Sequence, residues 1–436
     1  MKEVRNVRND IDAAALNKYH IRIIVLVAAL TIFDGYDNFI AAYVIHFTKD
    51  TWRLSLTQAG FLVSSGLIGF MAGALFNGSI ADRFGRKPTL IGALLVAGVF
   101  SMLTGLVAHS WATFLVLRVL TGVGLGVILP LSTAFVNEFM PKRVSNVTAI
   151  VATGGYNIGG VLAGLAGVFL TQSHGWEVLF LIGGLAIPIA ILCVFFLPES
   201  PLFLVAAGRT GQALKLMRSL VPGVSYDKAT LVLDEDTKNK GSIFVLLNAK
   251  NRRATLLIWA AETLILFNAY GLIGWIPTVM IARGESFASG FSLGALLQIT
   301  SLVGALACGF AADRTASRQL ALSLWWGLGS LSLIGLALVN SHFTNIALVA
   351  LCGFLVSGPL LVLGNLVAQL FDTEVRSTAV GVALGIGRTG GIIGPVAAGW
   401  IQQSTGDTRA MFLVMAGACV LSAAAVAHIK IQPDCD

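Results

Sequence analysis

Long uninterrupted apolar runs constrain the fold of this 436-residue chain more than any other feature. The runs reach at least about 18 residues, the length that an α-helix needs to cross the ~30 Å hydrocarbon layer of a bilayer. Only 12% of the residues are charged, whereas soluble domains have about 25%. A soluble chain of this length would lack the polar residues to cover its surface. The sequence therefore predicts an all-α polytopic membrane protein.

Twelve such runs follow one another along the chain. The predicted transmembrane helices cover residues 22–45, 57–80, 88–108, 111–137, 145–170, 176–197, 254–282, 287–312, 317–339, 343–370, 376–402 and 409–430. One long polar interruption separates the sixth helix from the seventh, and we expect it to be a linker loop with short amphipathic helices. The chain thus divides into an N-terminal six-helix half (1–197), the linker (198–253) and a C-terminal six-helix half (254–436).

Positive charge is distributed unevenly between the two sides of the predicted bundle. Of the 29 Lys and Arg residues, two lie within predicted helices and four lie on one side, namely Lys49, Arg53, Arg283 and Arg409. All the others lie on the side that carries both termini and the linker. By the positive-inside rule this side is cytoplasmic. The net charge of +7 is therefore interpreted as setting topology and not as a nucleic-acid-binding surface.

The two halves resemble each other in sequence. Three segments of the first half match three of the second at nearly the same spacing: 33–36 with 267–270, 78–83 with 309–314, and 139–159 with 371–391. Related six-helix halves of this kind place a binding site at their interface near the membrane midplane, where the halves can rock to give alternating access. We therefore expect a secondary transporter that moves a small solute and that is complete as a monomer.

The loop after the second predicted helix carries the most specific motif, Gly78-Ser-Ile-Ala-Asp82-Arg83-Phe-Gly85-Arg86-Lys87. Gly78 and Gly85 permit close backbone approach and a tight turn. Asp82 is expected to accept hydrogen bonds at a helix N-terminus, where the helix dipole favours an anion. The start of the eleventh helix is the proposed partner.

The arginines of this motif need acidic partners. Arg83 and Arg86 are expected to pair with carboxylates such as Glu138 on the same face. Together with the glycines and Asp82, they predict a latch that holds the cytoplasmic side closed. The second copy, Asp313-Arg314, lacks the later Gly-Arg-Lys and is expected to be a weaker latch. The alternative is a basic loop that only fixes topology.

Two carboxylates interrupt the first apolar run. Asp34 and Asp37 are three residues apart and so lie on one helical face. A charged carboxylate inside the bilayer costs roughly 2.5–3.5 kcal/mol on insertion scales, and two neighbours also repel each other. The pair is therefore the predicted proton-coupling site. The alternative is a structural pair that Arg118 or backbone groups satisfy.

Two arginines lie inside predicted helices, Arg118 in the fourth and Arg388 in the eleventh. Asp34 or Asp37 is the expected partner of Arg118, and a proton arriving there would release Arg118 towards a substrate carboxylate, which guanidinium geometry suits. Arg388 is a second cationic handle that favours an organic anion. A purely structural salt bridge for Arg118 and a snorkelling Arg388 remain as alternatives.

Polar and aromatic residues of the first and seventh helices complete the predicted substrate site. Asn268 stands at the repeat position of Asp34 and is expected to hydrogen-bond the substrate. The candidates for the walls around a ring are Tyr36, Tyr156, Tyr270 and Trp275, although aromatic residues in membrane helices also serve as ordinary packing. For Glu262 in the seventh helix, the sequence leaves two alternatives open, a structural role and a role in the site.

These motifs resemble the major facilitator superfamily over nearly the whole chain. Within it, Asp34-Gly35-Tyr36-Asp37 resembles the Asp-Gly-aromatic-Asp element of the aromatic acid:proton symporters, which related metabolite:proton symporters largely share. Pro198-Glu199-Ser200-Pro201 also fits their pattern. The resemblance implies two pseudo-symmetric halves and proton-driven uptake of small organic acids, such as hydroxybenzoates, across a bacterial inner (plasma) membrane.

Missing motifs limit the alternatives. The chain has no Gly-x4-Gly-Lys-Ser/Thr phosphate loop, which argues against ATP drive within this chain. Neither the histidines nor the cysteines have metal-ligand spacing, so no metal or cofactor is expected and an enzyme is disfavoured. The fifth helix lacks the Gly-Pro element of proton-antiporting drug exporters. The remaining alternatives are a symporter of a neutral sugar or polyol, an exporter, and a membrane sensor or receptor that does not transport.

Overall fold

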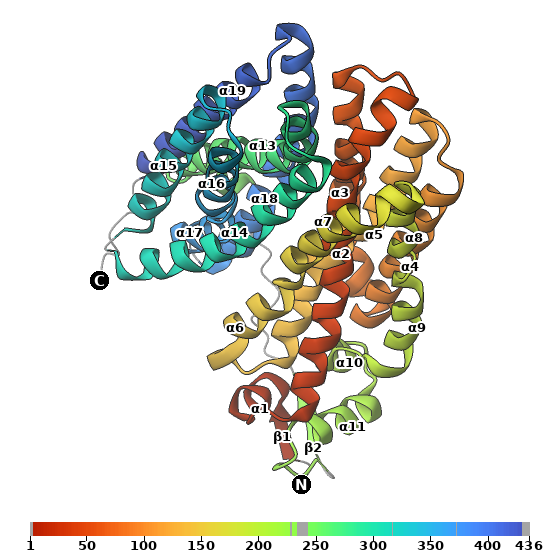
Figure 1. The fold of residues 1–436 in the computed structure, drawn as a ribbon. Coiled ribbons are helices and arrows are strands. Elements are labelled where there is room, and N and C mark those ends of the chain that lie inside the picture. Colours follow the sequence, from red (N-terminus) through yellow and green to blue (C-terminus); the bar gives the residue numbers. More distant parts are fainter. Residues whose placement is uncertain (1–2, 227–228, 233–242, 316, 372, 430–436) are drawn as a thin grey trace.

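The computed structural model describes residues 3–226, 229–232, 243–315, 317–371 and 373–429, and nearly all of them are helical (Figure 1). The first half contains α2 (Lys18–Thr51), α3 (Leu56–Phe84), α4 (Arg86–Val107), α5 (Trp111–Phe139), α6 (Lys142–Thr153), α7 (Gly155–His174), α8 (Glu177–Gly183) and α9 (Ala186–Phe196). The second half contains α13 (Arg252–Ala282), α14 (Phe287–Arg314), α15 (Arg318–Leu338), α16 (His342–Cys352), the π-helical turn η2 (Gly353–Ser357), α17 (Leu360–Leu370), α18 (Thr373–Thr405) and α19 (Thr408–Ala427).

Eleven spans of the described chain are long and apolar enough to cross a membrane. The remaining predicted helix, 145–170, is divided into α6 and α7 at Gly154. The predicted helix 176–197 is likewise divided into α8 and α9 near Gly184, and 343–370 is interrupted by η2. Clusters of Gly or Pro lie at these breaks, where the backbone loses regular i→i−4 hydrogen bonds.

The N-terminal segment and most of the described linker form a layer on the first half, whereas α12 (Ile243–Leu246) of the linker packs on the second half. The layer contains α1 (Val7–Ala13), α10 (Pro201–Ala206), α11 (Thr210–Leu220) and two short strands, β1 (Glu3–Asn6) and β2 (Ala229–Val232). The strands pair in parallel, with Glu3 opposite Ala229, which the all-α prediction did not include. Buried apolar residues of α1, α10 and α11 join the core of the first half. The acidic run 234–236 of the linker lies outside the described residues.

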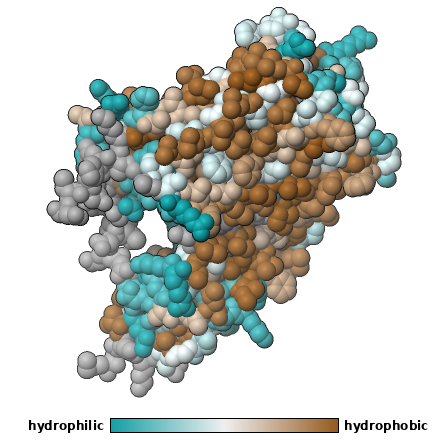
Figure 2. All heavy atoms as spheres, turned by 60° about the vertical axis from the view of Figure 1, so that its left-hand side comes forward, coloured by the Kyte–Doolittle hydropathy of each residue, from teal (hydrophilic) through white to brown (hydrophobic). Residues whose placement is uncertain are grey.

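Small residues allow the helices of each half to pack closely. A Cβ atom added at Gly69 would overlap the backbone of α5, and one added at Gly126 would overlap the backbone of α3. Helices in lipid rely on such contacts because lipid chains are as apolar as their side chains. Apolar residues therefore remain on the outside, and Figure 2 shows them across the middle of the visible face. Large exposed examples are Leu75, Phe169, Phe195, Leu338 and Phe343.

The two halves meet mainly along two helix pairs, α3 with α18 and α7 with α14. We call the end of the bundle where α2 and α13 begin the inner end, and the opposite end the outer end. At the outer end, Thr57 of α3 donates to Gln403 of α18 over 2.8 Å. Farther inward, Ser64 donates to the carbonyl of Ile392 over 2.7 Å. Gly167 and Gly164 of α7 pack on Phe291 and Ala295 of α14.

The halves diverge towards the inner end (Figure 1). Among the described residues, no atom lies within 4 Å of a Cβ placed on Gly78 of α3, or on Gly381 or Gly385 of α18. Figure 2 shows the hollow between the two lobes at this end, with hydrophilic side chains on its rims. The structure is therefore closed at the outer end and open at the inner end.

Candidate functional site

Arg388 lies near the middle of the bundle, where the two halves face each other. Its Nη1 donates to the hydroxyl of Tyr270 on α13 over 2.5 Å. Its guanidinium lies over the ring of Phe70 on α3, 4.2 Å from the ring centroid. A guanidinium at this distance from an aromatic face is stabilised by the ring quadrupole. Arg388 thus connects α18 and α13 of the second half to α3 of the first half.

Aromatic side chains of both halves surround this arginine. The hydroxyls of Tyr156 and Tyr270 are 3.3 Å apart, and the ring of Tyr156 contacts Phe39 edge-to-face at 5.1 Å. We call Phe39, Phe70, Tyr156 and Tyr270 the aromatic cluster. Phe39, Phe70 and Tyr156 belong to the first half, and Tyr270 belongs to the second. A cation beside such a cluster suits a planar anion, because the rings pack on its faces while the guanidinium pairs with its charge.

Asp34 is the acidic neighbour of this cluster. It is 0% exposed, and neither carboxylate oxygen has a hydrogen-bond partner among the described residues. The charges of Arg388 and Asp37 both act on it. Burial of an unpartnered carboxylate is costly and favours the protonated, neutral form. Asp34 is therefore a protonatable group close to a permanent cation.

The contact between α2 and α7 brings Asp34 to this position. A Cβ atom on Gly35 would overlap the carbonyl of Tyr156, and one on Gly159 would overlap the backbone of α2. The two helices can approach this closely only because both positions are glycine. The close approach places Asp34 beside Tyr156, whose hydroxyl reaches the second half.

Asp37 has a different environment from Asp34. Arg118 of α5 forms an ion pair with its carboxylate and donates from Nη2 to its backbone carbonyl over 3.0 Å. Arg118 is 1% exposed and Asp37 is 4% exposed, and Phe180 of α8 packs on the guanidinium. The pair lies inside the first half. The structure thus gives Arg118 one of its two predicted partners, and places it away from the interface where we expected it to meet a substrate.

Two predicted contact residues form hydrogen bonds within their own halves. The hydroxyl of Tyr36 donates to the carbonyl of Leu179 over 2.9 Å. Asn268 is fully buried, and its amide donates to the carbonyl of Leu264 one turn earlier. Residues two positions apart on a helix point about 200° apart, so Asn268 cannot share the direction of Tyr270. The alignment of the two halves pairs Asn268 with Asp34 by position in the sequence, but it does not show in which direction each side chain points.

Glu262 lies on the same face of α13 as Tyr270, two turns earlier. It is buried, and its stem packs against Gly387, the residue before Arg388. The charge of Arg388 acts on it. Arg388 therefore has one acidic neighbour in each half, Asp34 in the first and Glu262 in the second.

Sequence reasoning missed Phe70 and Tyr156 as members of the site. Tyr156 was considered only as one of several possible aromatic walls, and Phe70 was not considered. Aromatic residues are common in lipid-exposed helices, so neither residue carries a signal by type alone. The Gly154–Gly160 segment around Tyr156 was the available hint, because it predicts close helix packing there.

The loop between α3 and α4 forms a compact charged network. Arg86 donates to Asp82 over 2.7 Å and to Glu138 over 3.2 Å. Glu199 accepts from the backbone N–H groups of Arg86 and Lys87 over 2.9 and 3.2 Å, and so caps the start of α4. The expected contact of Asp82 with the start of the eleventh helix falls partly outside the described residues and stays a prediction. The carboxylate that caps α4 in this loop is Glu199, which sequence reasoning missed.

Gly85 joins α3 to α4 with a φ of +105°, which a residue with a side chain rarely adopts. A Cβ there would also overlap the carboxylate of Glu199. Arg83 is exposed and lies over the ring of Phe84. In this conformation no described residue approaches Gly78 closely. The network thus joins α3, α4, α5 and the start of the linker within the first half.

The second copy of the motif is simpler. Asp313 pairs with Arg318 over 2.9 Å, and Arg314 lies over the ring of Phe310, 3.7 Å from its centroid. Arg314 forms no ion pair with a described residue. Within the described ranges no group of three His, Cys, Asp or Glu side chains could hold a metal ion.

Comparisons with known proteins give a consistent result. The sequence model of the Major Facilitator Superfamily matches residues 26–324 and 294–434. The chain is 31% identical over 398 residues to the 4-hydroxybenzoate transporter PcaK of Pseudomonas putida, covering 89% of this chain and 88% of that protein. It is 30% identical over 407 residues to the benzoate transport protein of Acinetobacter baylyi, covering 91% and 86%. A gallate transporter of Pseudomonas putida is 30% identical over 438 residues, covering 98% and 96%.

Solved structures share the fold. A bacterial homologue of the human lysosomal transporter Spinster, in an inward-facing and occupied conformation, matches with a TM-score of 0.73 at 15% identity, covering 94% of this chain and 97% of that one. The partially occluded inward-open xylose transporter XylE of E. coli matches with a TM-score of 0.72 at 17% identity, covering 94% and 97%. The predicted architecture of two six-helix halves is confirmed.

Proposed function

This chain belongs to the major facilitator superfamily, and we propose that it takes up an aromatic carboxylate together with a proton across the bacterial inner membrane. It is a multi-pass membrane transporter for a small molecule and not an enzyme. In this proposal the inner end of the bundle, with both termini, faces the cytoplasm, in agreement with the positive-inside distribution of Lys and Arg. One chain supplies both sides of the site, so a monomer is sufficient.

The observation that carries the proposal is Arg388 within the aromatic cluster, beside Asp34, whose carboxylate has no hydrogen-bond partner in the described part of the chain. Benzoate, 4-hydroxybenzoate and gallate, the solutes named for the relatives, all combine a carboxylate with a benzene ring. A guanidinium binds a carboxylate through two parallel hydrogen bonds. The flat ring is then expected to pack between Phe70 and the two tyrosines. Arg388 replaces Arg118 as the proposed anion-binding residue.

Coupling to protons follows from the charges around Arg388. While Asp34 is ionised, it attracts Arg388 and competes with a substrate carboxylate for the same cation. A proton on Asp34 removes this competition, so the proton and the anion favour each other's binding. With Glu262 also protonated, the loaded site is neutral overall and is the form in which the halves rock. We propose Asp34 as the principal proton carrier and Asp37 as part of a structural ion pair.

Uptake into proteoliposomes tests the proposal. With an alkaline interior, the protein should accumulate radiolabelled 4-hydroxybenzoate with saturation, and Arg388→Gln should weaken the apparent affinity by roughly 10- to 150-fold, the loss of one charged hydrogen-bonded contact. Arg409→Gln, at an exposed arginine of the outer end, is the matched control and should behave as the native protein. Protein-free liposomes measure passive entry of the neutral acid.

Two results would contradict the proposal. Unchanged affinity in the Arg388→Gln protein would place the anion-binding residue elsewhere. Accumulation of xylose but of no aromatic acid would replace the substrate class with a neutral sugar.

A further inference from the structure

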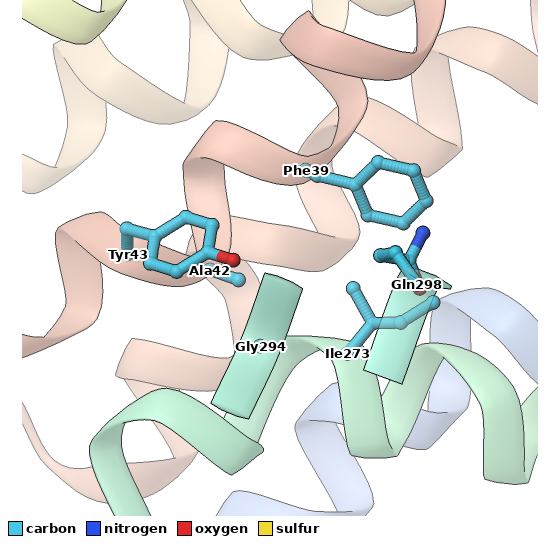
Figure 3. A pocket seen from close by; sticks show the side chains of 6 residues that line it. All are labelled: Phe39, Ala42, Tyr43, Ile273, Gly294 and Gln298. Carbon is cyan, nitrogen blue, oxygen red and sulfur yellow. The ribbon is translucent and has the colours of Figure 1, made fainter. Parts of the chain in front are cut away.

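A small cavity lies between the halves on the outer side of Arg388. Figure 3 shows its six lining residues: Phe39, Ala42 and Tyr43 of α2, Ile273 of α13, and Gly294 and Gln298 of α14. Its volume is about 10 Å³, the space that one water-sized group occupies. The cavity is therefore large enough for a single hydroxyl group or water molecule.

Two polar groups reach this cavity from opposite sides (Figure 3). Tyr43 is 3% exposed and Gln298 is 4% exposed. Neither the tyrosine hydroxyl nor the glutamine amide forms a hydrogen bond with a described residue. The Tyr43 hydroxyl is held in place by close packing, because a Cβ on Gly164 or Gly294 would contact it. Buried polar groups are nearly always satisfied, so this pair is suited to a polar guest.

The remaining walls are apolar. Phe39, Ala42 and Ile273 offer no hydrogen bonds to a guest, and none of the six lining residues carries a charge. An amide both donates and accepts, and so does a phenolic hydroxyl. A neutral hydroxyl group therefore fits this cavity better than a carboxylate or an ammonium.

The cavity adjoins the aromatic cluster. Phe39 lines the cavity and also contacts the ring of Tyr156. Gly160, one turn after Tyr156 on α7, packs against both the ring of Phe39 and the amide of Gln298. Gln298 therefore packs on α7 at the level of Gly160, which lies on the outer side of Tyr156.

Building on the proposed function, we propose that the cavity between Tyr43 and Gln298 is a subsite for a hydroxyl group on the ring position opposite the carboxylate. With the carboxylate on Arg388 and the ring among the aromatic cluster, this hydroxyl satisfies both polar groups. Benzoate leaves them without a partner, and a site built to bond a hydroxyl discriminates against the analogue that lacks it. The subsite therefore favours 4-hydroxybenzoate over benzoate.

Competition against radiolabelled 4-hydroxybenzoate in proteoliposomes tests this subsite. Benzoate, 3-hydroxybenzoate and 4-hydroxybenzoate are the competing probes. Gln298→Leu and Tyr43→Phe should each weaken the apparent affinity for 4-hydroxybenzoate by roughly 2- to 13-fold, the range for loss of one hydrogen bond. The affinity for benzoate should stay the same or improve. Thr300→Ala is the matched control on α14, because the Thr300 hydroxyl bonds the carbonyl of Leu296 in its own helix.

Each other outcome overturns a defined part of the proposal. Equal losses for benzoate and 4-hydroxybenzoate would make Tyr43 and Gln298 packing or gating residues without a role in hydroxyl recognition. A native protein that prefers 3-hydroxybenzoate would place the hydroxyl elsewhere. If the native protein transports no aromatic acid, the proposed function itself fails, whereas native transport with unaltered selectivity in both variants removes the subsite alone.

Discussion

Asp34 and Asp37 stand three residues apart on α2 and yet contact different parts of the protein. Such residues share a helical face in general, but they still differ by about 60° in direction. This difference is enough to give Asp37 the guanidinium of Arg118 and to leave Asp34 beside the interface of the halves without a hydrogen-bond partner among the described residues. One carboxylate is thus neutralised within its half, and the other is available to a proton.

Asp34→Asn is expected to separate binding from coupling. The amide resembles a protonated carboxyl group, so Arg388 stays free to bind a carboxylate at every pH. Counterflow exchange of 4-hydroxybenzoate should continue, while accumulation driven by a pH gradient should be lost. Asp50→Asn, at the exposed outer end of the same helix, is the control. Full pH-driven accumulation in the Asp34→Asn protein would assign the proton to another group.

Asp37→Asn is expected to act on folding first. Removal of one partner of a buried ion pair leaves a buried charge and costs about 3–5 kcal/mol, whereas replacement of both partners is often tolerated. The melting temperature in detergent should therefore fall in Asp37→Asn and recover in Asp37→Asn/Arg118→Met. A single variant that melts with the native protein but does not transport would return Asp37 to the coupling mechanism.

The charged members of the site were predictable from the sequence, and its aromatic members were not. Asp34 and Arg388 stand out because a charge within an apolar run is rare and costly. The roles of Phe70 and Glu199 depend on contacts with residues far along the chain, namely Arg388 for Phe70 and Arg86 for Glu199. No local pattern specifies such a pairing.

At the scale of elements, the contact between α2 and α7 controls the position of Tyr156. Gly35→Ala is expected to destabilise the protein and to weaken 4-hydroxybenzoate binding, because its Cβ would overlap the Tyr156 carbonyl and force the helices apart. Gly92→Ala on α4 is the matched control, since no described atom lies within 4 Å of its added Cβ. That change should stabilise its helix by up to about 1 kcal/mol. Equal melting temperatures and affinities in both variants would contradict the importance of this contact.

Hydropathy located the helices but not their interruptions. It averages over the length of a span, so it does not detect the break at Gly154 between α6 and α7 or the π-helical turn within the tenth predicted helix. The pairing of β1 with β2 was also beyond reach, because two four-residue strands far apart in the chain have no hydrophobic alternation long enough to recognise. These differences leave the order and direction of the helices unchanged.

At the scale of the whole molecule, α3 of the first half and α18 of the second half pack antiparallel to each other across the interface. The contacts of Ser64 with Ile392 and of Phe70 with Arg388 fix their register. Extended by two turns, it places Gly78 opposite residues 378–380, next to Gly381. Both glycines have open space around them in the present conformation. We infer that they approach each other when the inner end closes, which is the close contact that the sequence motif predicted.

Cross-linking tests this rocking motion directly. In a background with alanine in place of the native cysteines, cysteines at Thr57 and Gln403 are expected to react with a short bifunctional thiosulfonate in the ligand-free protein, since these side chains already touch at the outer end. Cysteines at Gly78 and Gly381 should react only while the protein is in the outward-open state, in which the inner end is closed. Both links should stop transport, because each holds one end of the bundle closed, and reduction should restore it. Cleavage at a protease site engineered into the linker reveals the link, since linked halves stay together on a denaturing gel.

Rapid reaction of the Gly78–Gly381 pair without any reaction at the outer pair would show that the resting protein opens to the outside, and would reverse the assignment of the closed end.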